Sequence, residues 1–311
     1  MSKRVLVTGA RGMVGRNFVE HPDAQALNIL MPTSQELELC NYTAVKDYMS
    51  QHRPDVVLHA AGRVGGIQAN IEQPVRFLLD NLDIGRNVIG AARACQIKNL
   101  INLGSSCMYP RNAITPLQEE MILQGELEPT NEGYALAKIT VARLCDYIRR
   151  EDAQCHYKTL VPCNVYGKYD QYDPARSHMI PAVIHKMHIA KVQGDNEVVI
   201  WGDGKARREF MYAGDLAQCL VQAVQRIDTL PGTMNVGLGT DHSVEEYYRA
   251  VADVVGFKGR FVCDLTKPVG MARKLVSVER AHAWGWQAQT TLRDGLEKTY
   301  AYYLESVNGK H

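Results

Sequence analysis

The sequence lacks the features that mark several whole classes of protein. No run of about 18 or more apolar residues occurs, so we expect no membrane-spanning helix. The 35 Lys and Arg residues nearly balance the 34 Asp and Glu residues, which argues against a broad surface for nucleic acid or for an anionic membrane. No apolar signal segment follows Met1. We therefore expect a cytoplasmic protein with neither a nucleic-acid nor a membrane partner.

The cysteines form neither a disulfide scaffold nor a metal-binding pattern. Eight of them are spread along the chain without a CxxC pair and without a histidine at metal-ligand spacing. We therefore expect no metal site. Scattered single thiols of this kind are typical of a reducing compartment such as the cytoplasm.

The chain does contain a long alternation of short apolar runs and longer helical segments. This order predicts an α/β fold of the Rossmann type, a doubly wound parallel sheet with helices on both faces. The expected strands are Arg4–Thr8, Asn28–Met31, Val56–Ala60, Leu100–Leu103 and Tyr157–Pro162. The expected helices lie near Gly12–Glu20, Val45–Gln51, Phe77–Cys95 and Tyr134–Arg150.

The second half of the chain predicts a smaller α/β lobe that is interleaved with the first. A polar loop, Tyr166–His178, precedes an expected helix at Ile180–Ala190 and an expected strand at Val198–Trp201. Gly232–Gly239 then has the pattern of another strand of the main sheet. The predicted nucleotide-binding domain is 1–165 plus roughly 206–238, and the predicted substrate-binding domain is roughly 166–205 plus 239–311.

A glycine-rich segment between the first strand and the first helix predicts a dinucleotide site. Gly9, Gly12 and Gly15 permit a tight turn, a close approach of the backbone to a pyrophosphate, and close packing of helix on strand. The N-terminal amides of the following helix favour the phosphate charge. The cofactor contacts expected in this segment are Gly9, Arg11, Gly12, Met13, Val14 and Gly15.

The residues after the second strand favour NADP over NAD. NAD sites usually place an acidic residue about 20 residues after the glycines to bind the ribose hydroxyls. Here that place holds Met31–Ser34, with no carboxylate, and Arg11 supplies a cation for a 2′-phosphate. The alternative for Arg11 is an ordinary solvated loop charge.

Three polar residues form a candidate site for carbonyl reduction. Tyr134 and Lys138 are four residues apart, and thus on one face of a helix, and Ser105 follows the strand that ends at Leu103. Hydride transfer to a carbonyl leaves an alkoxide, which a tyrosine protonates. We expect Lys138 to lower the pKa of the tyrosine and to hold the nicotinamide ribose.

These motifs, taken over the whole length, resemble the extended short-chain dehydrogenases/reductases. Five further segments narrow the resemblance to the GDP-L-fucose synthase family. They are Val64–Ile67 (VGGI), Gly104–Pro110 (GSSCMYP), Leu127–Glu132 (LEPTNE), Ser177–Pro181 (SHMIP) and Arg208–Phe210 (REF). The resemblance implies an NADPH-dependent 3,5-epimerase and 4-reductase that converts GDP-4-keto-6-deoxy-D-mannose to GDP-L-fucose. It also implies Ala60, Ala61 and Pro162 as further cofactor contacts.

The same resemblance assigns an epimerising pair, with Cys107 as the base and His178 as the acid. The chemistry is reasonable in itself, because protons on the carbons beside a ketone are acidic, so C3 and C5 can be inverted through enolates. A simpler interpretation makes Cys107 a core residue and His178 a solvated or capping histidine.

The GDP-sugar needs a local cluster of cations because the chain as a whole is nearly neutral. Arg207, Arg208, Arg273 and Lys274 are the candidates from the residues, and the resemblance favours Arg208 and Lys274. The full set of expected substrate contacts is Ser106, Asn164, His178, Lys186, Trp201, Arg208 and Lys274. Trp201 is expected to cover the guanosine, unless it is an aromatic of a strand core.

Other functions stay open at this stage. Ser34 stands where the family often has arginine, so the 2′-phosphate would depend more on Arg11 for a positive partner. Related substrates are another GDP-4-keto sugar of the 6-deoxy-hexose, colitose or heptose type, reduced at C4 with partial or no epimerisation in bacterial surface polysaccharide synthesis. A redox-sensing binding protein is a further alternative, against which the complete set Ser105, Tyr134 and Lys138 argues. A homodimer is expected through the helices at 77–95 and 134–150.

Overall fold

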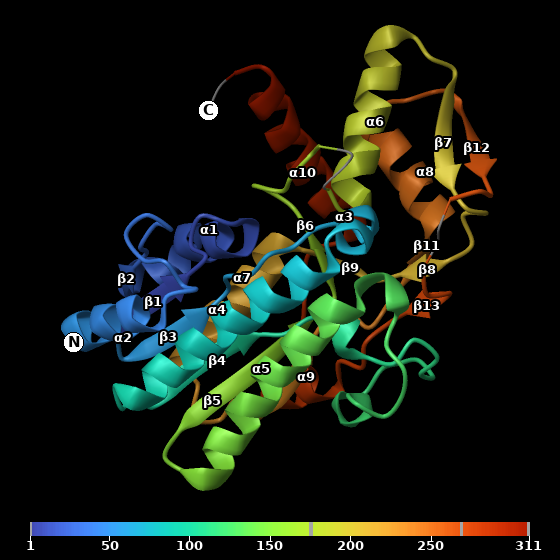
Figure 1. Ribbon diagram of the computed structural model, residues 1–311. Helices are drawn as coiled ribbons and strands as arrows, with labels where there is room; N and C mark the ends of the chain where they lie inside the picture. The colour runs from blue at the N-terminus through green and yellow to red at the C-terminus, as the bar shows by residue number, and fades with distance from the viewer. Residues whose placement is uncertain (1, 174–176, 268–269, 310–311) are drawn as a thin grey trace.

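The central feature of the computed structural model, which describes residues 2–173, 177–267 and 270–309, is a six-stranded parallel sheet (Figure 1). Its strand order is β10-β5-β4-β3-β1-β2, and every neighbouring pair is parallel. The strands are β1 Arg4–Thr8, β2 Asn28–Leu30, β3 Val56–His59, β4 Asn99–Leu103, β5 His156–Pro162 and β10 Thr233–Val236. The predicted fold class is confirmed, and the predicted strands agree with these bounds within a few residues.

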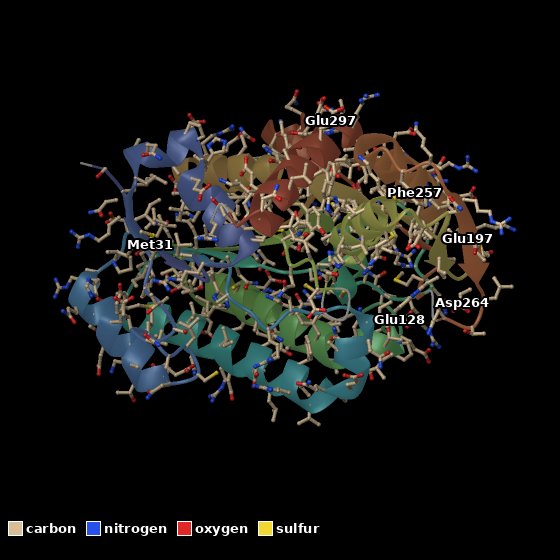
Figure 2. The ribbon with its side chains drawn as sticks, turned by 90° about the horizontal axis from the view of Figure 1, so that it is seen from above. Met31, Glu128, Glu197, Phe257, Asp264 and Glu297 are labelled. Carbon is tan, nitrogen blue, oxygen red and sulfur yellow. The ribbon has the colours of Figure 1, made fainter. Side chains whose placement is uncertain are left out.

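Helices cover both faces of this sheet. Seen from above in Figure 2, α2, α4 and α5 lie on one side, and α1 and α7 lie on the other. The bounds are α1 Met13–Glu20, α2 Tyr42–His52, α4 Pro74–Ala94, α5 Glu132–Glu151 and α7 Ala213–Gln225. Because β-strands of a parallel sheet end at one edge, this arrangement brings the loops after β1, β3, β4 and β5 together.

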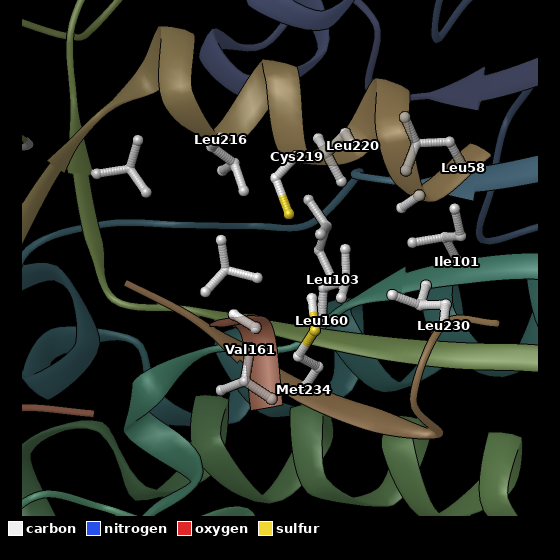
Figure 3. Close-up of a cluster of buried hydrophobic side chains, with 14 of the residues drawn as sticks. Leu58, Ile101, Leu103, Leu160, Val161, Leu216, Cys219, Leu220, Leu230 and Met234 are labelled. Atoms are coloured by element: carbon white, nitrogen blue, oxygen red, sulfur yellow. The ribbon is translucent and has the colours of Figure 1, made fainter. Parts of the chain in front are cut away.

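The core under α7 shows how the sheet and its helices hold together. Figure 3 shows Leu216, Cys219 and Leu220 of α7 pointing toward the strands, where they meet side chains such as Leu58 and Leu160. All five are fully buried. This contact between one helix and several strands fixes the ends of the strands from which the site is built.

A second lobe lies at the other end of the molecule (Figure 1). Its helices pack on one another around a separate core that contains Ile184, Met187, Tyr247 and Val251, with β7 parallel to β12 beside them. The elements are α6 Met179–Gln193, β7 Glu197–Trp201, α8 Val244–Val255, β12 Arg260–Asp264 and α10 Leu292–Val307. Short strands connect the lobes: β6 Asn164–Tyr166, β8 Arg207–Arg208, β9 Phe210–Tyr212, β11 His242–Ser243 and β13 Arg273–Lys274.

Local signals fix the ends of the lobe's helices. Ser243 Oγ accepts from the Glu246 amide at 3.1 Å, while a Glu246 carboxylate oxygen accepts from the Ser243 amide at 2.6 Å, which starts α8 with a capping box. Gly256 ends the helix at φ 77°, a conformation that favours glycine. No helix within the described part of the chain is both long and apolar enough to span a membrane.

The predicted division into domains differs from the packing in one segment. The strand at 233–236 joins the main sheet beside β5, as its sequence pattern predicts. However, Ala281, Trp284 and Trp286, in and just after α9 (Glu279–Trp284), are buried in the core of the main sheet rather than in the second lobe. Their apolar surface packs beside β10, so this part of 239–311 belongs to the first domain. The rest of the division stays a prediction.

Leu220→Ala tests the importance of the α7 contact. Leu220 is fully buried between α7 and the sheet, so its truncation leaves a cavity. We expect the free energy of unfolding to fall by about 2–5 kcal/mol in denaturant titration. Val192→Ala on α6, where the side chain is 70% exposed, is the control and should change stability by less than about 0.5 kcal/mol. Equal effects of the two changes would contradict this picture of the core.

Candidate active site

The glycine segment forms a tight cradle at the end of β1. Gly9 has φ +74°, and a Cβ placed there would lie 2.8 Å from both the Cα and the amide nitrogen of Ala61. A Cβ at Gly15 would lie 2.3 Å from the Gly9 carbonyl oxygen. The Gly12 amide donates to the Gly9 carbonyl at 3.0 Å, and α1 starts at the next residue, Met13. The cradle therefore leaves room for a phosphate group beside the open amides of the first helical turn, which is the form of a dinucleotide site.

Arg11 lies at the outer rim of this cradle, near the end of β2. Its side chain is exposed, and its charge reaches Glu36, a residue that the sequence analysis did not consider. Hydrogen bonds from Thr33 lower the pKa of Glu36, and Arg11 adds to that effect. The sequence pattern Thr33-x-x-Glu36 could have revealed Glu36, because it is typical of a reciprocal cap. The Glu36 amide donates to the Thr33 hydroxyl at 3.2 Å, and the Thr33 amide donates to the Glu36 carboxylate at 2.7 Å.

Ser105 and Tyr134 come together beyond the end of β4. Ser105 is the N-cap of the short helix η2 (Ser106–Met108), and its hydroxyl is near enough to the phenol of Tyr134, in the first turn of α5, to act on the pKa of that phenol. Burial raises the pKa of Tyr134 above its ordinary value, the nearby Cys107 acts in the same direction, and Ser105 opposes both. The sequence analysis expects Lys138 to lower this pKa, but burial prevails. Tyr134 is thus held as a protonated phenol, the form that donates a proton.

Lys138 connects the end of β4 to the loop after β3. Its ammonium donates to the Leu103 carbonyl oxygen at 2.9 Å and lies 5.9 Å from the centre of the Tyr134 ring. It is 7% exposed, and burial lowers its pKa to about 8. A Cβ at Gly62 would lie 2.9 Å from the Asn81 side-chain oxygen and at an ordinary contact of 3.5 Å from the Lys138 nitrogen, so the glycine there makes room for Asn81.

Asn81 is a buried positioning residue that the sequence reasoning missed. Its amide nitrogen donates to the carbonyl oxygens of Arg63 and Phe77, and its oxygen accepts from the Arg63 amide at 2.9 Å. These bonds hold the loop after β3, which carries Ala60 and Ala61, against α4. An asparagine within an amphipathic helix gives no local signal of such a role.

Cys107 has polar partners on two sides, unlike the cysteines of the cores. Its sulfur accepts from the Asn131 side-chain nitrogen at 3.3 Å and from the Lys274 ammonium at 3.6 Å. Cys145 and Cys219, by contrast, are fully buried in apolar surroundings. The interpretation of Cys107 as a simple core residue is therefore not favoured.

His178 stands at the N-cap position of α6, where the second lobe meets this cluster. Its side chain retains an exposed surface, while the protein packed around it and the positive charge of Lys274 lower its pKa. A Cβ at Gly66 would lie 3.2 Å from the Ser177 carbonyl oxygen, so the VGGI segment passes close to this residue's neighbour. The histidine and the cysteine are therefore both near Lys274.

The four candidate cations for a pyrophosphate have different partners in the structure. Arg207 and Arg273 donate to the carboxylate of Asp241, at 2.8 and 2.5 Å, so both are already paired. Arg208 lies on β8, which pairs with β13, and burial lowers its pKa while the charge of Glu128 opposes that shift. Figure 2 shows Glu128 between Met31, at the outer edge of the first domain, and Asp264 in the second lobe.

The other expected substrate contacts spread from the site into the second lobe. Trp201 is 47% exposed at the end of β7, so the alternative of a core aromatic is not supported. Lys186 donates to the Val199 carbonyl oxygen at 2.9 Å, and the Asn164 amide nitrogen donates to the Glu209 carbonyl oxygen at 3.1 Å. Residues nearer the main sheet are Ser106, which is buried, and the half-buried Pro162, Ala60, Ala61, Met13 and Val14.

The site therefore combines a dinucleotide cradle, a Ser-Tyr-Lys group and a cysteine with polar partners at one edge of a parallel sheet. Comparison with protein families agrees with this class of protein. Residues 5–237 match the NAD dependent epimerase/dehydratase family, and the chain belongs to that family.

Full-length relatives place the chain more closely. It is 50% identical to a GDP-L-colitose synthase of Yersinia pseudotuberculosis over 98% of this chain and 99% of that protein. It is 48% identical to a GDP-L-fucose synthase of Azorhizobium caulinodans over 97% and 96%. The predicted membership in the GDP-L-fucose synthase family of extended short-chain dehydrogenases/reductases is thereby confirmed.

Solved structures share the whole fold. A GDP-6-OMe-4-keto-L-xylo-heptose reductase from C. jejuni is 30% identical and superimposes with a TM-score of 0.92, covering 98% of each chain. A GDP-mannoheptose C4 reductase from Campylobacter jejuni with NADP bound is 32% identical, with a TM-score of 0.88 over 97% of this chain and 98% of that one.

The buried ammonium of Lys138 predicts a change of stability with pH. Its pKa is about 8 in the folded protein, against an ordinary value of 10.5. Between these values the unfolded chain holds one more proton here than the folded chain, so the contribution of this group to the free energy of unfolding rises with pH. We expect the stability of the wild type, relative to Lys138→Met, to increase from about pH 8 to about pH 10 in denaturant titrations. A difference that does not vary over that range would contradict the burial of the charged group.

Proposed function

We propose that the protein uses NADPH to epimerise GDP-4-keto-6-deoxy-D-mannose at C3 and C5 and to reduce it at C4, which yields GDP-L-fucose. The observation that carries the proposal is the short segment from Ser105 to Cys107, whose serine lies beside Tyr134 while its cysteine sulfur accepts from Lys274. This segment serves a reduction and a proton abstraction at once. The activities named for the relatives, GDP-L-fucose synthase and GDP-4-keto-heptose reductase, support the same chemistry.

The cofactor is held by the cradle at the end of β1. Gly9, Gly12 and Gly15 would hold the pyrophosphate, Ala60 and Ala61 would line the adenosine side, and Arg11 would meet the 2′-phosphate. When bound, NADPH supplies the hydride that reduces C4. The NADP in a solved relative of 32% identity supports this choice of cofactor.

Reduction at C4 uses the proton of Tyr134. Ser105 and Tyr134 donate hydrogen bonds to the C4 oxygen, and Tyr134 gives its proton to that oxygen as negative charge develops on it. The raised pKa of Tyr134 keeps the phenol protonated until that moment. The Lys138 ammonium then stabilises the phenolate and holds the nicotinamide ribose beside it.

Epimerisation uses the same carbonyl before it is reduced. The sulfur of Cys107 removes the proton from the carbon beside the C4 carbonyl, and the electron pair moves into an enolate whose oxygen is held by Ser105 and Tyr134. His178 returns a proton to that carbon from the opposite face. No net oxidation occurs, and the cycle closes when the thiol gives its proton to solvent and the imidazole takes one up, which restores the thiolate and the imidazolium.

The second lobe would hold the GDP part of the substrate. Arg208 is the phosphate candidate that the family resemblance favours, and it lies on β8 opposite Lys274 of β13. Trp201 offers an exposed ring to the guanine. The domain division into a cofactor half and a GDP-sugar half follows from these two placements.

A second candidate function is a GDP-L-colitose synthase, which the 50% identity to such an enzyme favours. By the family resemblance, GDP-colitose synthesis inverts one carbon only, and both candidate functions use the same reduction site. The number of carbons beside C4 that take up solvent deuterium, one or two, decides between them.

Tyr134→Phe tests the reduction and, with it, the alternative of a binding protein without turnover. The phenylalanine has no proton to give, so we expect NADPH oxidation with GDP-4-keto-6-deoxy-D-mannose to slow by about 100- to 10,000-fold while NADPH still binds. Tyr42→Phe, at the exposed start of α2, is the control. The wild type should prefer NADPH to NADH. No turnover of GDP-4-keto-6-deoxy-D-mannose by the wild type would overturn the proposed function.

We further infer a homodimer formed through α4 and α5. These helices pack against each other, and besides the side chains that they bury they keep the large apolar residues Val75, Leu79, Leu136 and Tyr147 at 67, 50, 40 and 52% exposure. Sedimentation should give the mass of two chains, and Leu79→Lys should shift it toward one. A monomer for the wild type would refute this arrangement.

The eight unpaired cysteines support the inference that the protein works in the cytoplasm. Cell fractionation measures this directly, and recovery from an oxidising compartment would contradict it.

A further inference from the structure

We propose that Lys274 is a positioning residue that holds Cys107 in its anionic, reactive form, rather than only a clamp for the substrate's pyrophosphate. The proposal deepens the function above and rests on it for the identity of the base. It assigns a role in proton abstraction to a residue of β13. The proposal follows from the surroundings of one sulfur atom.

The sulfur of Cys107 lies between two hydrogen-bond donors. The Lys274 ammonium is 3.6 Å from it, and the Asn131 side-chain amide is 3.3 Å from it on another side. Both groups donate, and hydrogen bonds to a sulfur anion favour that anion over the thiol. The ammonium adds a full positive charge, which is the kind of neighbour that activates catalytic cysteines.

The main chain holds Lys274 at this place. Its strand, β13, pairs with β8, with Lys274 opposite Arg208. On one side Arg273 binds Asp241, and on the other the Val276 amide donates to the buried carboxylate of Glu209 at 3.0 Å. With both flanks fixed, the backbone from which Lys274 reaches the sulfur is held in place.

The charges of the pair also act on its titratable neighbours. Tyr134 on α5 faces Cys107, and burial and a negative sulfur both raise the pKa of that phenol, so the proton donor for C4 stays protonated while the base is active. His178 at the start of α6 faces Lys274, and burial and the charge of Lys274 both lower the pKa of the imidazole. The ammonium thus favours the anionic form of the base and does not favour the protonated form of the acid.

The test measures the reactivity of Cys107 in the ligand-free protein. Iodoacetamide alkylates only the thiolate, forming a thioether and releasing iodide, so the rate of alkylation against pH reports the titration of each cysteine. Peptide mass spectrometry separates Cys107 from Cys263, an exposed thiol that serves as the internal reference. We expect Cys107 of the wild type to react at lower pH than Cys263.

Neutral replacements of Lys274 should remove this difference. With Lys274→Met or Lys274→Gln, we expect the pH midpoint of Cys107 alkylation to rise by about one unit, and its rate at pH 7 to fall about tenfold, which matches one pKa unit. Lys274→Arg should keep most of the effect, and Lys258→Met, an exposed lysine between α8 and β12, should change nothing. Alkylation of Cys263 should be unchanged in every variant.

Two results separate this role from others. If the neutral variants bind GDP more weakly while the midpoint of Cys107 stays at the wild-type value, Lys274 is a phosphate clamp and the proposal is overturned. Because alkylation needs no sugar substrate, a shifted midpoint supports the proposal even where turnover of GDP-4-keto-6-deoxy-D-mannose fails. In the active enzyme, the acid limb of the pH profile of solvent exchange into substrate should move upward in Lys274→Gln and return in Lys274→Arg.

Discussion

The hydrogen bond from the Lys138 ammonium to the Leu103 carbonyl oxygen is the contact on which the site depends. It ties α5 to the last residue of β4, and the chain turns there into the short helix that carries Ser105 and Cys107. Burying an ammonium costs free energy, because the group loses its hydration, unless hydrogen-bond partners compensate for that loss. The first turn of α5 is therefore held in register with the end of the sheet, which sets the position of Tyr134 against Ser105.

Two of the arginines near the site are held in ion pairs, whereas the lysine beside the reactive sulfur is not in the same pair. Asp241 binds Arg207 and Arg273 and so removes two of the cations near the second lobe. Lys274 remains beside Cys107, and the buried Glu209 accepts from the Val276 amide just after its strand and from the Leu238 and Gly239 amides after β10. Glu209 thus ties the chain beyond Lys274 to the end of the main sheet.

The sequence predicts much of the fold because its strands, helices and glycine turns depend on local patterns. Gly9 and Gly15 follow from the strand-turn-helix context, and Tyr134 and Lys138 follow from the helical repeat. Pairings between distant residues leave no such pattern. Lys274 and Cys107 are 167 positions apart, and neither sequence position suggests the other as a partner. For the same reason, the sequence does not predict that Trp284 and Trp286 pack in the core of the main sheet.

The central claim is that one site inverts the carbons beside a carbonyl and then reduces that carbonyl. The direct measurement is turnover of GDP-4-keto-6-deoxy-D-mannose with NADPH in deuterated water, followed by mass spectrometry of the isolated product sugar. GDP-L-fucose with solvent deuterium at both C3 and C5 is the expected product, and Cys107→Ser should lose the label while the C4 carbonyl is still reduced. A reduced sugar that carries no solvent deuterium at either carbon would contradict the claim.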